Sequence, residues 1–141
     1  MKNFQDFKTD ASFHTERYEQ GLKDELLILP LLRRFFHDES IDLLQEGFTF
    51  DFYGEGKVIE FKARTNSSRD YYDTAIGANK IRSAAKLHEK NLNVFFVFKF
   101  TDVVFYWKYD PKITLRQFPI NKIDHYFIPR TLLTSIDETV L

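Results

Sequence analysis

The hydrophobic positions between residues 15 and 36 recur at intervals of three and four residues. On a helix Tyr18, Leu22, Leu29, Leu32 and Phe36 form one stripe, and the acidic residue Glu25 falls on the same stripe. We therefore predict a helix over residues 15–36, preceded by an irregular polar segment over residues 1–12. Pro30 falls inside the pattern, so we expect it to kink the helix or split it in two.

Alternating apolar and polar positions predict two strands near residues 48–53 and 57–63, with a short strand at 41–44 before them. Residues 64–73 are polar and turn-forming, which predicts a loop. Asp73 or Thr74 is a suitable N-cap for a second helix over residues 75–90.

The dense apolar run at residues 93–100 predicts a central strand buried on both faces, and residues 103–109 predict the next strand. After Pro111 we expect short strand-like pieces, with Pro119 and Pro129 as breaks. This order of elements predicts an α/β (α+β) fold, with a mixed sheet flanked by helices.

Composition limits the function classes. The chain has 141 residues and is 43% hydrophobic, which predicts a single domain over residues 1–141. It has sixteen Phe and seven Tyr, so rings should fill much of the core. The absence of cysteine excludes disulfides, thiolate zinc sites and cysteine nucleophiles. No apolar run approaches the ~20 residues of a membrane span, and the N-terminus lacks a signal-peptide pattern. We therefore expect a soluble intracellular protein.

Charge is unevenly distributed along the chain. The net charge is -1, yet residues 57–90 carry eight basic and four acidic side chains, a net charge of +4 that leaves -5 for the rest. A basic middle segment can contact phosphates. Ordinary surface charge explains the same numbers equally well.

The predicted hairpin brings two carboxylates together. Alternation places Phe48, Phe50 and Phe52 on an apolar face and Asp51 on the opposite one. A tight turn at residues 55–56 then sets Asp51 directly across from Glu60. Two facing carboxylates are destabilising unless something neutralises them.

A hard divalent cation such as Mg²⁺, or Mn²⁺ in its place, would neutralise this pair through carboxylate oxygens. Lys62 lies on the same face, where it can orient a metal-bound water or balance the charge of a phosphate. A solvated strand face bearing the same charges is the alternative from these residues alone.

The layout of these residues resembles the PD-(D/E)XK nuclease superfamily. The shared features are an acidic residue on a helix, Asp51 on a strand, Glu60-x-Lys62 on the next strand, and then a helix and a buried strand. The layout is similar to that of small archaeal Holliday-junction resolvases and small phage nucleases. The resemblance implies a restriction-endonuclease-like core and metal-dependent hydrolysis of phosphodiester bonds.

The resemblance also implies roles for individual residues. Asp51 and Glu60 would ligate Mg²⁺, with the backbone carbonyl of Phe61 as a further ligand, and Lys62 would lie beside the attacking water. Glu25, in the segment Gly21-Leu-Lys-Asp-Glu25, would be the helical acid, acting through a second ion or a water.

One residue of this site departs from the superfamily pattern, and the choice of the helical acid stays open. Phe50 stands where the superfamily name implies proline before Asp51. If Pro30 distorts the helix, Glu25 lies at the edge of the stripe, and Glu16 and Glu19 are substitutes on the same helix.

Basic residues around this segment are candidates for nucleic-acid binding. Lys80 on the second predicted helix is a candidate phosphate contact, as the resemblance implies. Arg64 and Arg69 lie in the polar loop, and Arg82 and Lys86 lie on the second predicted helix. For the last two, a solvated helix face is the alternative.

These observations favour a Mg²⁺-dependent endodeoxyribonuclease that acts on double-stranded or branched DNA, without a membrane. A junction substrate, a phage source, a homodimer and a place in the host cytoplasm are further expectations from the resemblance. The alternatives are a catalytically inactive nucleic-acid-binding module of the same fold, and a structural protein with an accidental acid pair.

Overall fold

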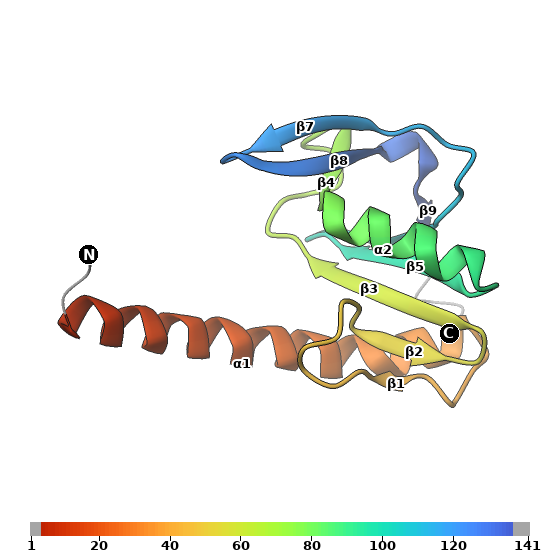
Figure 1. Ribbon diagram of the computed structural model, residues 1–141. Helices are drawn as coiled ribbons and strands as arrows, with labels where there is room; N and C mark the ends of the chain where they lie inside the picture. Colours follow the sequence, from red (N-terminus) through yellow and green to blue (C-terminus); the bar gives the residue numbers. More distant parts are fainter. Residues whose placement is uncertain (1–3, 137–141) are drawn as a thin grey trace.

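The computed structural model describes residues 4–136, and these form layers around a central sheet (Figure 1). In chain order the elements are α1 (Phe4–Phe35), β1 (Asp42–Leu43), β2 (Phe52–Gly54), β3 (Lys57–Ala63), β4 (Asp73–Gly77), α2 (Ala78–Glu89), β5 (Asn93–Lys99), β6 (Val104–Lys108), β7 (Arg116–Ile120), β8 (Ile123–Pro129), a 3₁₀ turn η1 (Arg130–Leu132) and β9 (Thr134–Ser135). None of these helices is long and apolar enough to cross a bilayer.

The strands form two sheets. The larger has the order β1-β2-β3-β5-β6-β9, and the smaller has the order β4-β8-β7. Strands β3 and β5 are parallel, whereas the other neighbouring pairs are antiparallel. The chain returns from β3 to β5 through β4 and α2, as a parallel pair requires. This mixed sheet with flanking helices confirms the fold class predicted from the sequence.

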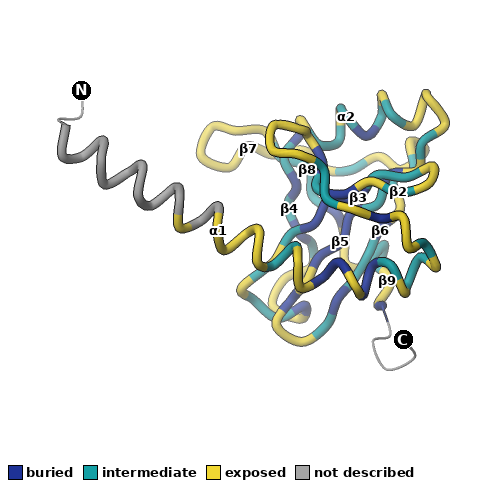
Figure 2. The backbone as a smooth tube through the Cα atoms, turned by 90° about the horizontal axis from the view of Figure 1, so that it is seen from below, coloured by how far each residue is buried: buried dark blue, intermediate teal, exposed yellow. Residues whose placement is uncertain are grey.

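Two hydrophobic clusters cover the two faces of the larger sheet. On one face α1 packs Leu29 and Leu32 against Ile59 and Val97. On the other face lie α2 and the smaller sheet, around Phe96. Figure 2 shows that the middle of β3 and most of β5 are buried, whereas β7 is exposed. The prediction that residues 93–100 form a strand buried on both faces is confirmed.

Helix α1 begins earlier than predicted and is not divided at Pro30. It begins at Phe4, so the irregular segment expected over residues 1–12 is wrong from residue 4 onward; residues 1–3 lie outside the described part. The helix also continues through Pro30 without splitting. Ile28, Leu29, Leu31 and Leu32 flank the proline and are all buried, and this packing outweighs the cost of about 3 kcal/mol from the missing hydrogen bond and the clash of the proline ring with the preceding turn.

The segment before α2 is a strand, which the sequence analysis missed. Residues 73–77 form β4, and α2 begins only at Ala78, with Gly77 as its N-cap. Thr74 and Ile76 are buried on β4, where they pair with Ile128 and Tyr126 of β8. The expected helix start at Asp73 or Thr74 is therefore wrong, because these residues pair with β8, a strand far along the chain.

Prolines near the C-terminus act unequally. Pro119 lies inside β7, contrary to the expected break, and Pro129 ends β8 as expected. Strand β7 is at the edge of the smaller sheet, where a residue without an amide hydrogen is tolerated.

Candidate active site

The β2–β3 hairpin positions the predicted carboxylates. Its register is the predicted one, with Gly54 opposite Lys57 and Phe52 opposite Ile59. However, β2 begins only at Phe52, so the expected strand from residue 48 and the ladder pair between Asp51 and Glu60 are both wrong. The Asp51 amide still donates to the Ile59 carbonyl at 3.0 Å, so Asp51 lies just beyond the end of the ladder.

A bend before β2 fixes Asp51 between two anchors. Phe52 is buried in the cluster beneath α1, whereas Phe50 is buried in the cluster on the opposite face. Phe48 is 62% exposed. The prediction that the three rings share one face is therefore wrong, because residues 48–51 are not extended. The two buried rings hold the backbone of Asp51 from both sides of the sheet.

Three carboxylates meet at Asp51. Its Oδ2 accepts a hydrogen bond from the Phe61 amide at 2.8 Å, and Glu25 and Glu60 line the same cavity, close enough for Asp51 to raise the pKa of both. Burial, and then Asp51, raise the pKa of Glu25 to about 7. The same causes raise the pKa of Glu60, which is only 2% exposed, to about 8. The structure thus brings Glu25, on α1, to the hairpin acids, whereas Glu16 and Glu19 are exposed.

Two lysines balance part of this negative charge. The Nζ atom of Lys80, on α2, lies 2.8 Å from Oε2 of Glu60 and also donates to the Thr49 carbonyl. Lys62, on β3, is close enough to lower the pKa of both Glu25 and Glu60. Lys80 was expected at a phosphate, and the structure places it against a carboxylate of the same site.

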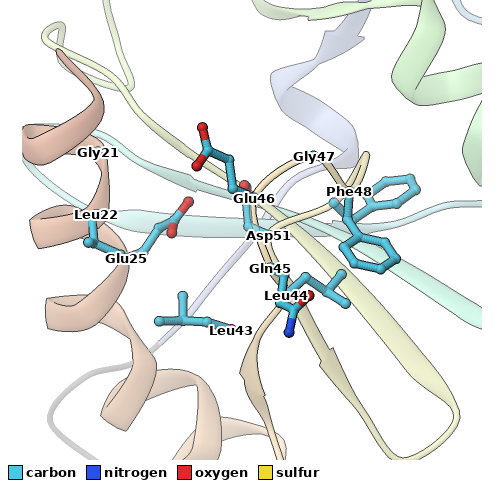
Figure 3. A pocket seen from close by; sticks show the side chains of 11 residues that line it. Gly21, Leu22, Glu25, Leu43, Leu44, Gln45, Glu46, Gly47, Phe48 and Asp51 are labelled. Atoms are coloured by element: carbon cyan, nitrogen blue, oxygen red, sulfur yellow. The ribbon is translucent and has the colours of Figure 1, made fainter. Parts of the chain in front are cut away.

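The carboxylates open onto a groove between α1 and the end of β3. A cavity of about 410 Å³ is lined by Glu25, Asp51, Glu60, Phe61 and Lys62, together with Gln20, Gly21, Asp24 and Ala63. An adjoining cavity of about 290 Å³ shares Gly21, Glu25 and Asp51 with it. Figure 3 shows Glu25 reaching from α1 toward Asp51 across this second cavity.

Sequence reasoning missed two acidic residues in these cavities. Asp24 lines the first cavity and Glu46 lines the second. Glu46 lies in the loop before Gly47, whose φ of 97° turns the chain. Neither residue has a strand or helix spacing that relates it to Asp51, so the sequence held no signal for them.

The donor atoms suit a hard cation. Within the described residues, no group of three or more His, Cys, Asp or Glu side chains has the geometry of ligands to one ion. The chemistry nevertheless fits, because Glu25, Asp51 and Glu60 line one cavity, and Glu60 is almost fully buried there with the Lys80 ammonium 2.8 Å from its Oε2. Buried carboxylate oxygens of this kind are ligands that Mg²⁺ and Mn²⁺ prefer.

The backbone supplies a further oxygen in the same place. On a strand, the amide and carbonyl of one residue point to the same edge. The Phe61 amide donates to Asp51, so the Phe61 carbonyl also faces the edge where β2 has ended. Phe61 lines the larger cavity as well.

The remaining basic candidates lie elsewhere. Arg64 is partly buried: its Nη2 donates to the Ala75 carbonyl, and its guanidinium lies 5.6 Å from the centre of the Phe98 ring. Burial also lowers its pKa. Arg64 therefore joins β3 to β4, contrary to its expected place on the phosphate-binding surface. Arg69, Arg82 and Lys86 are exposed.

Comparison with known proteins agrees with this geometry. The family described as "Phage putative PDDEXK endonuclease" matches residues 46–119, which include Asp51, Glu60, Lys62 and Lys80. Neither the curated proteins nor the solved structures gave a match to the chain. The matched segment spans just over half of the 141 residues. The chain therefore belongs to this phage family of PD-(D/E)XK endonucleases.

Proposed function

We propose that this nuclease is a divalent-metal-dependent DNA endonuclease that acts as a single domain over residues 1–141. Its active site would comprise Glu25, Asp51, Glu60 and Lys62. The observation that carries the proposal is the closeness of Asp51 to both Glu25 and Glu60, beside two lysines and in an open groove.

Asp51, Glu60 and the Phe61 carbonyl would hold Mg²⁺ or Mn²⁺, with Glu25 completing the acidic cluster through a second ion or a water. The bound ion would supply a Lewis acid that polarises the phosphate and lowers the pKa of its water. The raised pKa values of Glu25 and Glu60 support this assignment, because buried carboxylates crowded against Asp51 are groups that a divalent cation would neutralise.

The chain's own residues would orient the attacking water and the carboxylates, and would stabilise the charge that develops on the phosphate. Lys62 faces the groove, where its ammonium can position the attacking water or balance charge that develops on the phosphoryl oxygens. The Phe61 amide fixes the Asp51 carboxylate, and Lys80 fixes Glu60. Hydrolysis forms a new bond from the water oxygen to phosphorus, and one phosphodiester P–O bond breaks.

The shape of the site favours a long substrate. Double-stranded or branched DNA, including junctions, can lie along an open groove such as this one but could not enter an enclosed pocket. A homodimer follows by analogy with junction-cutting nucleases, and action in the host cytoplasm follows from the phage family.

A cleavage panel of linear, nicked, branched and single-stranded DNA, with RNA alongside, tests the proposal. We expect Mg²⁺-dependent cleavage that Asp51→Asn and Lys62→Ala each reduce by about 10² or more, with little change in folding. Lys108→Ala, at an exposed lysine on β6, is the matched control and should cleave normally.

A thermal melt with and without Mn²⁺ forms the second arm. Wild type should gain stability from the ion and Asp51→Asn should not, because only a ligand of the native state raises the melting temperature. Salt-sensitive binding of DNA without any cleavage would favour the inactive binding module instead. Equal turnover by Lys62→Ala and wild type would refute the proposed site.

A further inference from the structure

The β7–β8 hairpin has a tip of defined shape. Ile120 pairs with Ile123, and the two residues between them, Asn121 and Lys122, have φ values of 50° and 68°. Two consecutive positive values define a two-residue turn of type I′, whose twist matches that of the strands it joins. The tip is therefore preorganised.

Large apolar side chains are exposed at this tip. Phe118 is 58% exposed, Ile120 38% and Ile123 63%. The register places them on one face of the hairpin, because Ile120 is opposite Ile123 and Phe118 is opposite His125. Tyr126 and Ile128, on the opposite face, pack into the core. An apolar group of this kind on a soluble protein marks a surface that contacts something.

The hairpin lies on the same side of the molecule as the candidate active site. In Figure 1 the free end of the hairpin and the C-terminal end of β3 point the same way, and α1 extends in that direction too. Figure 2, viewed along a perpendicular axis, also shows the β7 end on the side to which the coloured part of α1 extends. A substrate long enough to pass the end of β3 would therefore meet this hairpin.

Charge identifies the kind of partner. The hairpin, residues 116–129, contains two basic side chains and one acidic side chain, a net charge of +1, and Lys112 and Arg130 at its root raise this to +3. Residues 19–27 of α1 contain one basic and three acidic side chains, a net charge of -2. A polyanion entering between them is attracted to the hairpin and repelled by α1. A symmetric contact with a second copy would instead bring the same basic residues face to face.

The root of the hairpin is fixed to the body. The Arg116 guanidinium lies 4.5 Å from the centre of the Phe127 ring, and its Nη2 is 3.5 Å from Oδ2 of Asp73 on β4. Strand β4 leads directly into α2, which carries Lys80. The tip therefore has a fixed position relative to the carboxylates.

We propose that the β7–β8 hairpin is a DNA-binding wedge, in which Phe118 and Ile123 insert into a groove of the duplex and Lys122 contacts a phosphate. Apolar side chains presented in this way partly unstack base pairs and bend the helix. This inference rests on the proposed function for the identity of the polymer. It adds a binding element that lies largely beyond residues 46–119, the segment that the family matches.

Binding without cleavage tests the wedge. The affinity of a fluorescein-labelled duplex is measured by anisotropy in EDTA, so that no hydrolysis takes place. Phe118→Ser combined with Ile123→Ser should weaken binding about tenfold or more. Leu26→Ser combined with Leu27→Ser, at leucines 52% and 74% exposed on α1, is the matched control and should bind like wild type.

Two further readouts report on insertion and on the phosphate contact. An aminopurine base in the duplex should brighten when wild type binds and should stay dim with the Phe118/Ile123 variant, because insertion unstacks the base. Lys122→Gln should lower the slope of log affinity against log salt by about 1, whereas Lys108→Gln should leave it unchanged.

The outcomes separate this inference from the proposed function. Wild type that binds DNA through the hairpin but does not cleave it supports the wedge and refutes the nuclease mechanism. Normal affinity of a folded Phe118/Ile123 variant overturns the wedge even if cleavage is normal. Absence of DNA binding by wild type also overturns it. A third contrary result is sedimentation that shows wild type to be a dimer and the variant a monomer, when both bind the duplex with equal affinity.

Discussion

Replacing Glu60 with glutamine should stabilise the protein in the absence of metal. Glu60 is 2% exposed, and its pKa rises from 4.5 to about 8 through burial and the neighbouring Asp51. Between these pH values the folded state binds more protons than the unfolded state, so stability falls as the pH rises through the interval. Below about pH 4.5 the carboxyl is neutral in both states and this loss is absent.

The size of the effect follows from the shift. A change from 4.5 to about 8 corresponds to about 5 kcal/mol when Glu60 is fully ionised, and to about 3 kcal/mol at pH 7. Glutamine keeps the shape and cannot ionise, so Glu60→Gln should match wild type near pH 5 and exceed it progressively toward pH 9. Urea denaturation in EDTA across this range measures the difference.

The control is Glu39→Gln, an exposed carboxyl outside both cavities, which should follow the wild-type profile. Added Mn²⁺ should raise the stability of wild type and leave Glu60→Gln nearly unchanged. Parallel pH profiles for wild type and Glu60→Gln would refute the reasoning, since Glu60 would then ionise equally well in the folded and unfolded states.

Two further predictions concern the turn that supports the site. A Cβ at Gly54 would lie 2.7 Å from Oδ2 of Asp38 and 2.8 Å from Cγ1 of the buried Ile41, so Gly54→Ala should destabilise by about 1–3 kcal/mol in urea denaturation. Gly21→Ala, with nothing near the added carbon, should instead stabilise by about 1 kcal/mol, and equal effects would contradict this account. Hydrogen bonds from Lys57, Ser40 and the Glu55 amide hold the pKa of Asp38 well below its usual range. Asp38→Asn should therefore be less stable than wild type at pH 7, with a gap that narrows as the pH falls below 4 in chemical denaturation, and a constant gap would disprove it.

Local patterns in the sequence predicted most of the larger sheet. The register of β2 and β3 followed from the turn at residues 55–56, and β5 from its apolar density. The smaller sheet could not be found in this way, because β4 at residues 73–77 pairs with β8 at residues 123–129. Such pairing depends on contacts far apart in the chain, which periodicity does not encode.

The candidate site was predicted to a similar degree. Spacing identified Asp51, Glu60 and Lys62, and the helical stripe identified Glu25, all of which line one cavity. The sequence did not predict that Phe50 and Phe52 would enter opposite clusters, because alternation assumes an extended backbone. It also did not predict that Lys80 would bind Glu60 or that Arg64 would bridge two strands, since both contacts depend on how the layers pack.

Because Glu25 lies on α1, the active site can lose this side chain while the larger sheet stays folded. Glu25 comes from a different element and a different face than Glu60, and α1 rests on the sheet through side chains C-terminal to Glu25, from Ile28 to Leu32. Fraying of α1 from Phe4 as far as Glu25, about six turns, would withdraw this acid while leaving every strand pair intact. Inactivation by mild heat or denaturant can thus precede global unfolding, and refolding of that one helix would restore it.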